Sequence, residues 1–387
     1  MIAAIYTPQL EVISHMELTV RKSDLLPELQ LFQGIVERKN TIPILANILV
    51  ESDGDGTIQL LATDLEVGLR SHCPASIVKK GSLTIPAKKF YEIVRALPDT
   101  DIQIKEGAKG SVKISADQFN SRMQTLPRED FPTLPSEVDG AATILLPRAS
   151  LREMVSKTQF AITGEDTRYF LNGALFVLQP GKMNFVATDG HRLSLVSTPR
   201  EKVKGEAEDL QAILPKKTLW ELLRLLSDGE DAVKYTVGEN HLFFKVDGRQ
   251  LISRVIDAQF PAYERVIPQG NDKIIEFERD RLTSAIKRVA LLSSERSRAV
   301  KFQISSGNLD ISSSSPEVGE ATETLTVEYS GDDVEICFNA QYVLDFLSVA
   351  DSDNVQLHLK DEVSQAVMTP VGSEGCEYTY VIMPMRV

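Results

Sequence analysis

The sequence has few cysteines and no long apolar run, and each of these absences excludes a class of protein. Its 387 residues include three cysteines, Cys73, Cys337 and Cys376, which are too far apart for a CxxC zinc or redox motif. A sparse, odd number is typical of free thiols in a reducing compartment, so we expect a cytoplasmic protein. No run approaches the ~18 apolar residues of a membrane-spanning helix, and residues 1–15 lack the basic start of a signal peptide. We therefore expect no membrane association.

The sequence also has fewer basic than acidic residues. The chain has 42 lysines and arginines against 55 acidic residues, a net charge of −13 and an isoelectric point near 5.0. An acidic total is untypical of a nucleic-acid-binding protein, although a basic surface can lie within an acidic protein. With 42% hydrophobic and 25% charged residues, the composition is that of a globular protein, and the length predicts two to four domains.

The sequence repeats itself at the scale of a domain. The segment IPAKKFYEIVRALPD (85–99) aligns without a gap with LPKKTLWELLRLLSD (214–228), 129 positions later. A weaker third copy, FNAQYVLDFLSVA (338–350), follows after a further 124 positions. Solenoid repeats recur every ~20–50 residues, so this longer period predicts tandem copies of one small domain.

Each copy has the same order of predicted elements. A helical segment comes first, at 22–38, 148–162 and 279–292, and a pair of strands follows. The aligned segment is the second helix, and its apolar residues recur at i, i+3, i+4 and i+7, as expected for a helix that packs one face on a sheet. Alternating strands close the unit. We therefore predict an α+β fold with antiparallel sheets and two helices on one face in each copy.

Lysines and arginines gather on these helices, whereas acidic residues gather in segments that read as loops, such as EGEAEDL and SGDDVE. Taken singly, each helix is most simply a solvated face, but the recurrence across copies favours a non-specific phosphate-binding surface. No pattern for base readout is present. The cations are Lys88, Lys89 and Arg95; Arg148, Arg152 and Lys157; Lys216, Lys217 and Arg224; and Arg279, Arg281, Lys287 and Arg288.

The stretch FVATDGHRLSL resembles an acid–base site, because it combines Asp189, His191, Arg192 and Ser194. A hydrolase or transferase that uses this aspartate, the histidine and a nearby hydroxyl is therefore one hypothesis. The first copy, however, has ATDLEVGL, which keeps the aspartate as Asp64 and lacks the histidine. We therefore predict that both aspartates cap or turn a strand. The five histidines have no metal-ligand spacing, so neither a catalytic residue, a cofactor nor a metal is predicted.

Several motifs together closely resemble one family. They are TIPILANIL, ATDLE, IPAKKFYEIVRALP, RYFLNGALF, ATDGHRLSL, FPAYERVIP, FNAQYVLDFL and the C-terminal YVIMPMRV. From Met16 to Val387 the chain resembles the beta subunit of bacterial DNA polymerase III, the sliding clamp. The resemblance implies clamp domains at 16–141, 142–268 and 269–387 after an N-terminal extension, 1–15. It also implies a head-to-tail dimeric ring, with helices lining the hole and sheets outside, that encircles double-stranded DNA without sequence specificity. A scaffold of three domains that forms no ring is the remaining alternative.

The resemblance further implies a groove for short hydrophobic peptides of the replicative polymerase, clamp-loader subunits, repair polymerases and mismatch-repair proteins. Two methionines would make this groove adaptable. Lys39 matches a DNA-contacting position, and Leu291 and Leu292 match the dimer interface, where Ser121 replaces a frequent aromatic on the opposite side. The implied groove residues are Leu171, Thr188, Gly190, His191, Arg192, Leu193, Pro261, Arg265, Val266, Asn339, Tyr342, Val381, Ile382, Met383, Pro384, Met385 and Arg386.

Overall fold

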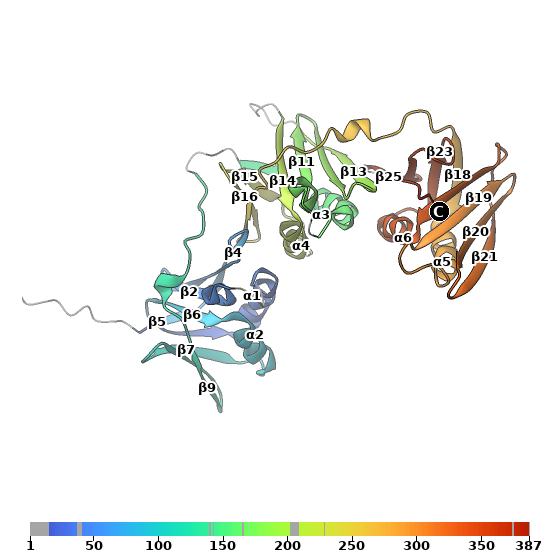
Figure 1. The fold of residues 1–387 in the computed structure, drawn as a ribbon. Helices are drawn as coiled ribbons and strands as arrows, with labels where there is room; N and C mark the ends of the chain where they lie inside the picture. Colours follow the sequence, from blue (N-terminus) through green and yellow to red (C-terminus); the bar gives the residue numbers. More distant parts are fainter. Residues whose placement is uncertain are drawn as a thin grey trace, which may run out of the picture. The chain divides into compact units, whose positions relative to one another are not determined.

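A computed structural model describes residues 15–36, 41–138, 141, 143–164, 166–201, 209–227, 229–373 and 375–386. Almost all of the expected N-terminal extension, and Lys39, lie outside these residues. The chain divides into two compact units, which comprise residues 1–145 with 231–254, and residues 146–230 with 255–387 (Figure 1). No helix among the described residues combines the length and the apolar character that crossing a membrane requires.

The described part of the first unit has two α-helices and two sheets. The helices are α1 (Lys22–Ile35) and α2 (Ala87–Ala96), which pack against each other. A five-stranded sheet has the order β5 (Ser76–Lys79), β1 (Glu17–Arg21), β7 (Asp101–Gly107), β8 (Ser111–Ala116), β9 (Phe119–Gln124). An eight-stranded sheet has the order β10 (Thr143–Leu146), β15 (Val233–Val237), β16 (His241–Val246), β17 (Arg249–Arg254), β4 (Val67–Pro74), β3 (Thr57–Thr63), β2 (Asn47–Asp53), β6 (Ser82–Pro86).

Among its described residues, the second unit has four α-helices and two sheets. The helices are α3 (Arg148–Thr158), α4 (Lys216–Leu225), α5 (Arg279–Ala290) and α6 (Ala340–Val349). The eight-stranded sheet has the order β14 (Leu210–Pro215), β11 (Gly173–Gln179), β12 (Lys182–Thr188), β13 (Arg192–Pro199), β25 (Glu377–Ile382), β24 (Ala366–Pro370), β23 (Asn354–Leu359), β18 (Lys273–Glu278). The four-stranded sheet has the order β21 (Gly319–Thr326), β20 (Asn308–Ser315), β19 (Ala299–Ser305), β22 (Val334–Asn339).

The second helix of each copy is one-sided, as the periodicity predicts. In α2 the buried side chains are Ala87, Phe90 and Val94, whereas the lysines between them are exposed. The helix starts directly after Pro86 and ends with Arg95 in its last turn, where a cation interacts favourably with the helix dipole. The first helices are shorter than predicted. For example, α1 ends at Ile35 because Val36 is already extended, with φ −72° and ψ 132°.

The copies share sheets, and this explains why the compact units do not follow the repeats. In the first unit, β4 of copy one pairs with β17 of copy two, with Gly68 opposite Ile252. In the second unit, β13 of copy two pairs with β25 of copy three, with Leu193 opposite Val381. Copy two therefore contributes strands to both units. At each copy boundary, an edge strand of one copy is satisfied by pairing with a strand of the next copy.

Candidate functional site

A tight turn joins β12 to β13 at the sequence ATDGHR. The Asp189 carboxylate accepts the backbone N–H groups of His191 and Arg192 at 2.9 and 3.1 Å. The Thr188 hydroxyl donates to the Arg192 carbonyl at 2.6 Å and accepts the Gly190 N–H at 3.1 Å. Asp189 and Thr188 therefore hold the backbone of this turn, as short polar side chains often do.

The first copy makes the same turn without a histidine, which confirms the prediction that both aspartates turn the chain. Asp64 accepts the N–H groups of Glu66 and Val67 at 2.9 and 2.7 Å, and Thr63 donates to the Val67 carbonyl at 3.0 Å. The position of Gly190 is taken by Leu65, and φ is +88° at the glycine and +80° at the leucine. Because the bonds are the same in both copies, they have a structural origin, and this arrangement lends no support to an acid–base site.

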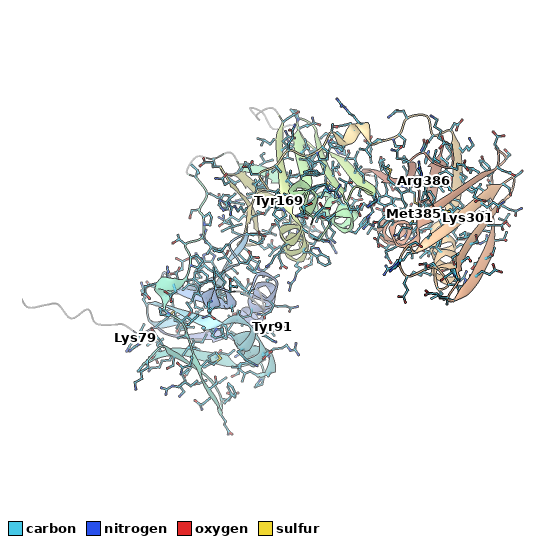
Figure 2. The ribbon with its side chains drawn as sticks, in the orientation of Figure 1. Lys79, Tyr91, Tyr169, Lys301, Met385 and Arg386 are labelled. Atoms are coloured by element: carbon cyan, nitrogen blue, oxygen red, sulfur yellow. The ribbon has the colours of Figure 1, made fainter. Side chains whose placement is uncertain are left out.

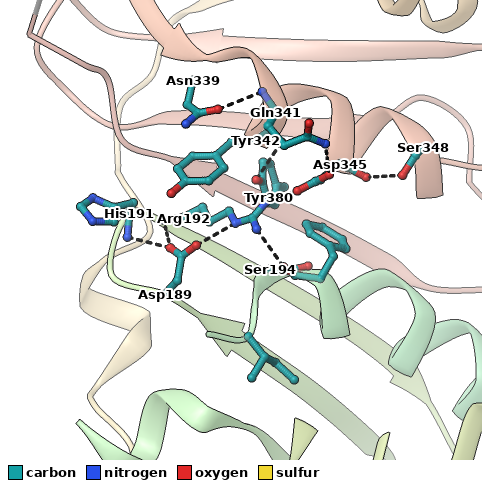
Figure 3. A network of polar contacts seen from close by, with 12 residues as sticks. Asp189, His191, Arg192, Ser194, Asn339, Gln341, Tyr342, Asp345, Ser348 and Tyr380 are labelled. Carbon is teal, nitrogen blue, oxygen red and sulfur yellow. Dashed lines mark hydrogen bonds and ion pairs between the residues drawn. The ribbon is translucent and has the colours of Figure 1, made fainter. Parts of the chain in front are cut away.

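What is particular to copy two is the side chain of Arg192, which links copies two and three (Figure 3). Its guanidinium donates to Asp189 at 2.9 Å, to Asp345 on α6 at 2.6 Å and to the Phe160 carbonyl at 2.8 Å. It also lies 4.3 Å from the ring centre of Tyr342, close enough for a cation–π interaction. The arginine side chain is only 9% exposed, so this network is a buried connection between β13 and α6.

The charges of this network determine its protonation. Burial by itself would lower the pKa of Arg192, but the neighbouring Tyr380 and the carboxylates of Asp345 and Asp189 raise it overall, so the guanidinium is charged. Burial lowers the pKa of Lys216, and the positive charge of Arg192 lowers it further. The Lys216 ammonium donates to the Ile162 carbonyl at 2.9 Å and is partly buried, so it belongs to this region more than to an open cationic surface.

In the second unit, an apolar cluster lies on the face of the eight-stranded sheet that is opposite to α3 and α6. Its buried base comprises Leu175, Val177, Val186, Leu193, Ile213 and Val381, and we call this set the groove floor. Partly buried side chains pack on it from the loop that follows β17, among them Phe260, Tyr263 and Val266. Thus Leu193, Val266 and Val381 of the implied peptide groove lie together, and Leu171 is buried in the short helix Tyr169–Asn172 that precedes β11.

The C-terminal segment is held beside the ATDGHR turn by its backbone. The Met383 N–H donates to the His191 carbonyl at 2.9 Å, and the Met385 N–H donates to the Cys337 carbonyl at 2.8 Å. Both methionine side chains and Pro384 remain partly exposed, and Arg386 is exposed (Figure 2). The segment therefore presents two unbranched, polarizable side chains beside His191, which is itself exposed.

Other implied groove residues have identifiable positions in this unit. Pro261 and Arg265 are exposed in the loop before β18. Asn339 caps α6, where its side chain accepts the Gln341 N–H at 2.9 Å. Tyr342 is partly exposed, and its carbonyl accepts the Tyr380 hydroxyl at 2.9 Å.

One implied groove residue is wrong. Ile382 is fully buried, and it follows Val381 in the same strand, so the two side chains point to opposite faces of the sheet. Tyr380, which shares the face of Ile382, has its ring centre 5.4 Å from that of Phe346 on α6. Ile382 therefore belongs to the core beneath the helices, not to the groove floor.

The matching surface in the first unit is filled by the chain itself. Gly68 occupies the position of Leu193, and a Cβ atom built there would lie 3.0 Å from Leu134 Cδ2. Leu134 is buried with Phe131 in an apolar cluster over the sheet. The repeat therefore carries the same surface at both copy boundaries: Leu134 packs on it at the first, and its sequence equivalent, Tyr263, packs on it at the second.

Most of the predicted DNA-facing cations lie on exposed helix faces. In copy one these are Lys88, Lys89 and Arg95, and in the other copies they include Arg152, Lys287 and Arg288. Several are paired with acids: Lys89 contacts Glu92 of the same helix at 2.7 Å, and Arg288 contacts Glu323 on β21 at 2.5 Å. Lys217 is partly exposed, as is Arg224, which contacts Glu221 at 3.1 Å.

The expectation that Lys157 faces DNA is wrong. Lys157 is only 2% exposed, and its ammonium contacts Glu153 at 2.5 Å and Asp351 at 2.9 Å. Burial alone would lower the pKa of Lys157, but the hydrogen bonds that its ammonium donates to these two carboxylates raise it overall. Arg148, from the same predicted cationic face, is also buried and donates to the Leu225 carbonyl at 2.9 Å. Both side chains are structural cations inside the second unit.

The residues matched to the dimer interface are two leucines after α5 and a serine on an edge strand. Leu291 follows α5 and is 77% exposed, and Leu292 is partly exposed. Ser121 lies on β9, the last strand of the five-stranded sheet, where its hydroxyl donates to the Ile114 carbonyl at 3.2 Å. An edge strand has unpaired backbone groups that can pair with another chain.

Sequence reasoning missed several residues of the site. Asp345 and Phe160 complete the Arg192 network, and Phe170, Phe260 and Tyr263 pack on or beside the groove floor. The sequence did contain a signal for Tyr263. The segment FPAYERVIP aligns with FPTLP, and in this alignment Tyr263 takes the position of Leu134, which is buried. Asp345 gives no such signal, since it lies 153 positions from Arg192.

Comparison with known proteins gives one consistent result over nearly the whole chain. Residues 16–135, 145–262 and 264–386 match the family models for the N-terminal, central and C-terminal domains of the DNA polymerase III beta subunit. The beta sliding clamp of Pseudomonas putida (strain KT2440) is 38% identical, and that of Escherichia coli (strain K12) is 37% identical. Each of the two alignments covers 96% of this chain and 100% of the relative.

Solved structures agree with this result. A sliding clamp from Pseudomonas aeruginosa bound to griselimycin is 36% identical, with a TM-score of 0.89. A sliding clamp from Bartonella birtlesii bound to griselimycin is 35% identical, with a TM-score of 0.90. Both comparisons cover 96% of this chain and 100% of the other chain. With three family domains in tandem and antiparallel sheets that run from copy to copy, this chain belongs to the family of DNA polymerase III beta subunits, the sliding clamps.

Proposed function

We propose that this chain works as a head-to-tail dimeric ring that encircles duplex DNA without reading its sequence. The ring would tether the replicative polymerase, clamp-loader subunits and repair proteins through the peptide groove. The proposed clamp domains are 16–141, 142–268 and 269–387, and residues 1–15 would be an extension outside them. In this account the protein acts in the cytoplasm, catalyses no reaction of its own and needs no cofactor.

The observation that carries the proposal is a recurring helix pair with exposed cations in a strongly acidic protein. Lys88, Lys89 and Arg95 in copy one and Lys287 and Arg288 in copy three lie on solvent-facing helix surfaces. Cations of this kind bind phosphates without sequence preference, typically with dissociation constants of ~10⁻⁴–10⁻⁶ M. Such weak contacts permit sliding, provided that enclosure of the DNA prevents escape.

Closure of the ring is supported by unpaired surfaces at two sheet ends. β9 and β21 are each the last strand of their sheet, and Leu291 is exposed after α5. A head-to-tail interface is heterologous, so it produces a closed ring only if the rotation between subunits closes after two copies. Ser121 on β9 offers a smaller contact than an aromatic would, so we expect this ring to open more readily than that of a relative with an aromatic there.

The peptide groove is supported by the groove floor and by the segment Met383–Arg386 beside it. Its apolar base suits hydrophobic anchor side chains, and the two methionines can repack around peptides of different shape. Arg265 and Arg386 are exposed and could pair with acidic groups of a partner.

Retention on DNA of different topology tests the ring. After loading by a clamp loader, we expect the protein to stay on a closed circular duplex and to leave the same DNA once it is cut. Equal retention on the two forms would refute topological binding. Removal of Met385–Val387 is expected to abolish binding of a polymerase-derived peptide, while the protein remains a dimer in solution. Unchanged peptide affinity in this variant would refute the groove assignment.

A further inference from the structure

Two of the three second helices carry the same solvent-facing pattern, in which an aromatic residue stands between two cations. In α2 the residues are Lys88, Tyr91 and Arg95. In α4 they are Lys217, Trp220 and Arg224, at the same spacing and 129 positions later. Positions three before and four after a helical residue lie on its own face, so each aromatic is flanked by cations on one surface.

The third copy is an internal comparison. At the equivalent positions α6 carries Gln341, Leu344 and Ser348, so the aromatic and both cations are absent together. The aromatic residue and its two flanking cations therefore occur together in two copies and are missing together from the third, which is the pattern expected if the three side chains serve one ligand.

The exposure of these rings has no explanation in packing. Trp220 is 53% exposed on α4, where the buried positions are taken by Leu219 and Leu222. Tryptophan and tyrosine are enriched at interfaces, because they combine a large apolar ring with a polar group. Tyr91 is partly exposed on α2 (Figure 2), and its ring centre lies 5.8 Å from the Arg95 guanidinium. Both rings are thus held on the surface beside positive charge.

The Tyr91 ring lines a groove between α1 and α2 within the first unit. The groove has a volume of about 690 Å³, within the ~300–1,000 Å³ range typical of small-molecule sites. Gln33, Val36 and Ala46 form one wall, and Lys88, Tyr91 and Arg95 form the other. Glu92 also lines the groove, and its carboxylate contacts the ammonium of Lys88 at 4.0 Å and that of Lys89 at 2.7 Å. Beside this acid, the Tyr91 ring and the Arg95 guanidinium offer a stacking surface and a positive charge, which match a planar, uncharged base attached to a phosphate.

We propose that Tyr91 and Trp220 are stacking platforms for unpaired bases, so that each of these two helix faces binds single-stranded DNA in addition to duplex. In a duplex the base faces are already stacked, so cations alone would contact its phosphates, whereas an unpaired base can stack on an aromatic ring. The proposal rests on the proposed function in one respect, namely that these helix faces meet nucleic acid.

Affinity for a labelled oligothymidine measures the stacking directly. The full-length protein is titrated at low salt and followed by fluorescence anisotropy. The test variant carries Tyr91→Leu and Trp220→Leu, and its matched control carries Tyr91→Phe and Trp220→Phe, which keeps a ring at both positions and all neighbouring charges. Base–aromatic stacking predicts a loss of about five- to one-hundred-fold per base for the leucine variant and little loss for the phenylalanine variant. In the wild-type protein, Trp220 is the single tryptophan, so its emission should be quenched by the oligonucleotide.

Three results would overturn the proposal. They are equal affinity in the leucine variant, an equal loss in the phenylalanine control, or an equal loss for a duplex of the same length. Retention of the leucine variant on closed circular duplex separates this proposal from the proposed function. If retention on circles is normal while single-strand binding is unaffected by the substitutions, stacking is wrong and the ring stands. If the wild-type protein itself is not retained on circles, the ring is wrong whatever the oligonucleotide does.

Discussion

Replacement of Arg192 by methionine tests how strongly this side chain holds copies two and three of the repeat together beside the groove. Methionine has similar length and no charge, so the change removes the hydrogen bonds to Asp189, Asp345 and the Phe160 carbonyl with little change of volume. It also removes the cation–π contact with Tyr342. The turn should survive, because copy one makes the same turn with Val67 in the arginine's position.

The expected loss in the free energy of unfolding depends on which hydrogen bonds Asp189 and Asp345 keep in the variant. Loss of one partner of a buried ion pair typically costs ~3–5 kcal/mol. Asp189 retains two backbone N–H donors, and Asp345 is 23% exposed and keeps a hydrogen bond from Gln341 at 2.7 Å. Neither carboxylate is left without a donor, so we expect the lower end of the range, about 3 kcal/mol in the free energy of unfolding of the second unit.

Hydrogen exchange measures this loss locally and supplies its own control. The Met383 N–H, bonded to the His191 carbonyl, should exchange roughly one-hundred-fold faster if exchange reports an opening favoured by ~3 kcal/mol. The equivalent bond in the first unit, from the Arg254 N–H to the Glu66 carbonyl, should be unaffected. Affinity for a groove-binding peptide should fall as well, since Met383 borders the groove. A change below ~1 kcal/mol would refute the reasoning, because that is the range of solvent-exposed pairs.

Three further perturbations probe the turn, an ion pair and the thiols. Gly190→Ala should cost ~1–2 kcal/mol by thermal unfolding, because φ is +88° and the new Cβ would lie 3.1 Å from Arg168 Nη1; a neutral result would mean that the turn relaxes. Arg168→Ala should return the pKa of Asp166 from about 2 toward ~3.9, because the hydrogen bonds and charge of Arg168 favour the carboxylate. A carbon-detected NMR titration measures this pKa, and an unchanged value would contradict the prediction. This interaction is therefore complete above pH ~4 and lost as pH falls through the folded-state pKa of about 2. Burial raises the pKa of Cys376 to about 11, so at neutral pH it should react with a thiol reagent only after unfolding, whereas the partly exposed Cys337 should react first; the reverse order would contradict this assignment.

The repeat was readable from the sequence because its helices and turns depend on local patterns. The one-sided helix at 85–99 needs only its own apolar spacing, and the ATD turn needs only hydrogen bonds among residues 188–192. The error at Ile382 was avoidable on the same grounds, because adjacent residues of a strand face opposite sides. For Lys157 the pattern showed Glu153 four positions earlier, but not Asp351, which lies 194 positions away.

The sequence by itself thus determined the threefold duplication, the order of elements and the class of surface that each helix presents, since these follow from periodicities of two and 3.6 residues. Only the tertiary structure decided which lysines remain in water, which copy boundary is covered by Leu134, and which strands of different copies pair. Those outcomes depend on contacts between residues far apart in the chain, where one glycine at position 68 or one carboxylate at position 351 changes what a neighbour can do. Local pattern carries no information about such partners, because burial and charge pairing are properties of the assembled fold.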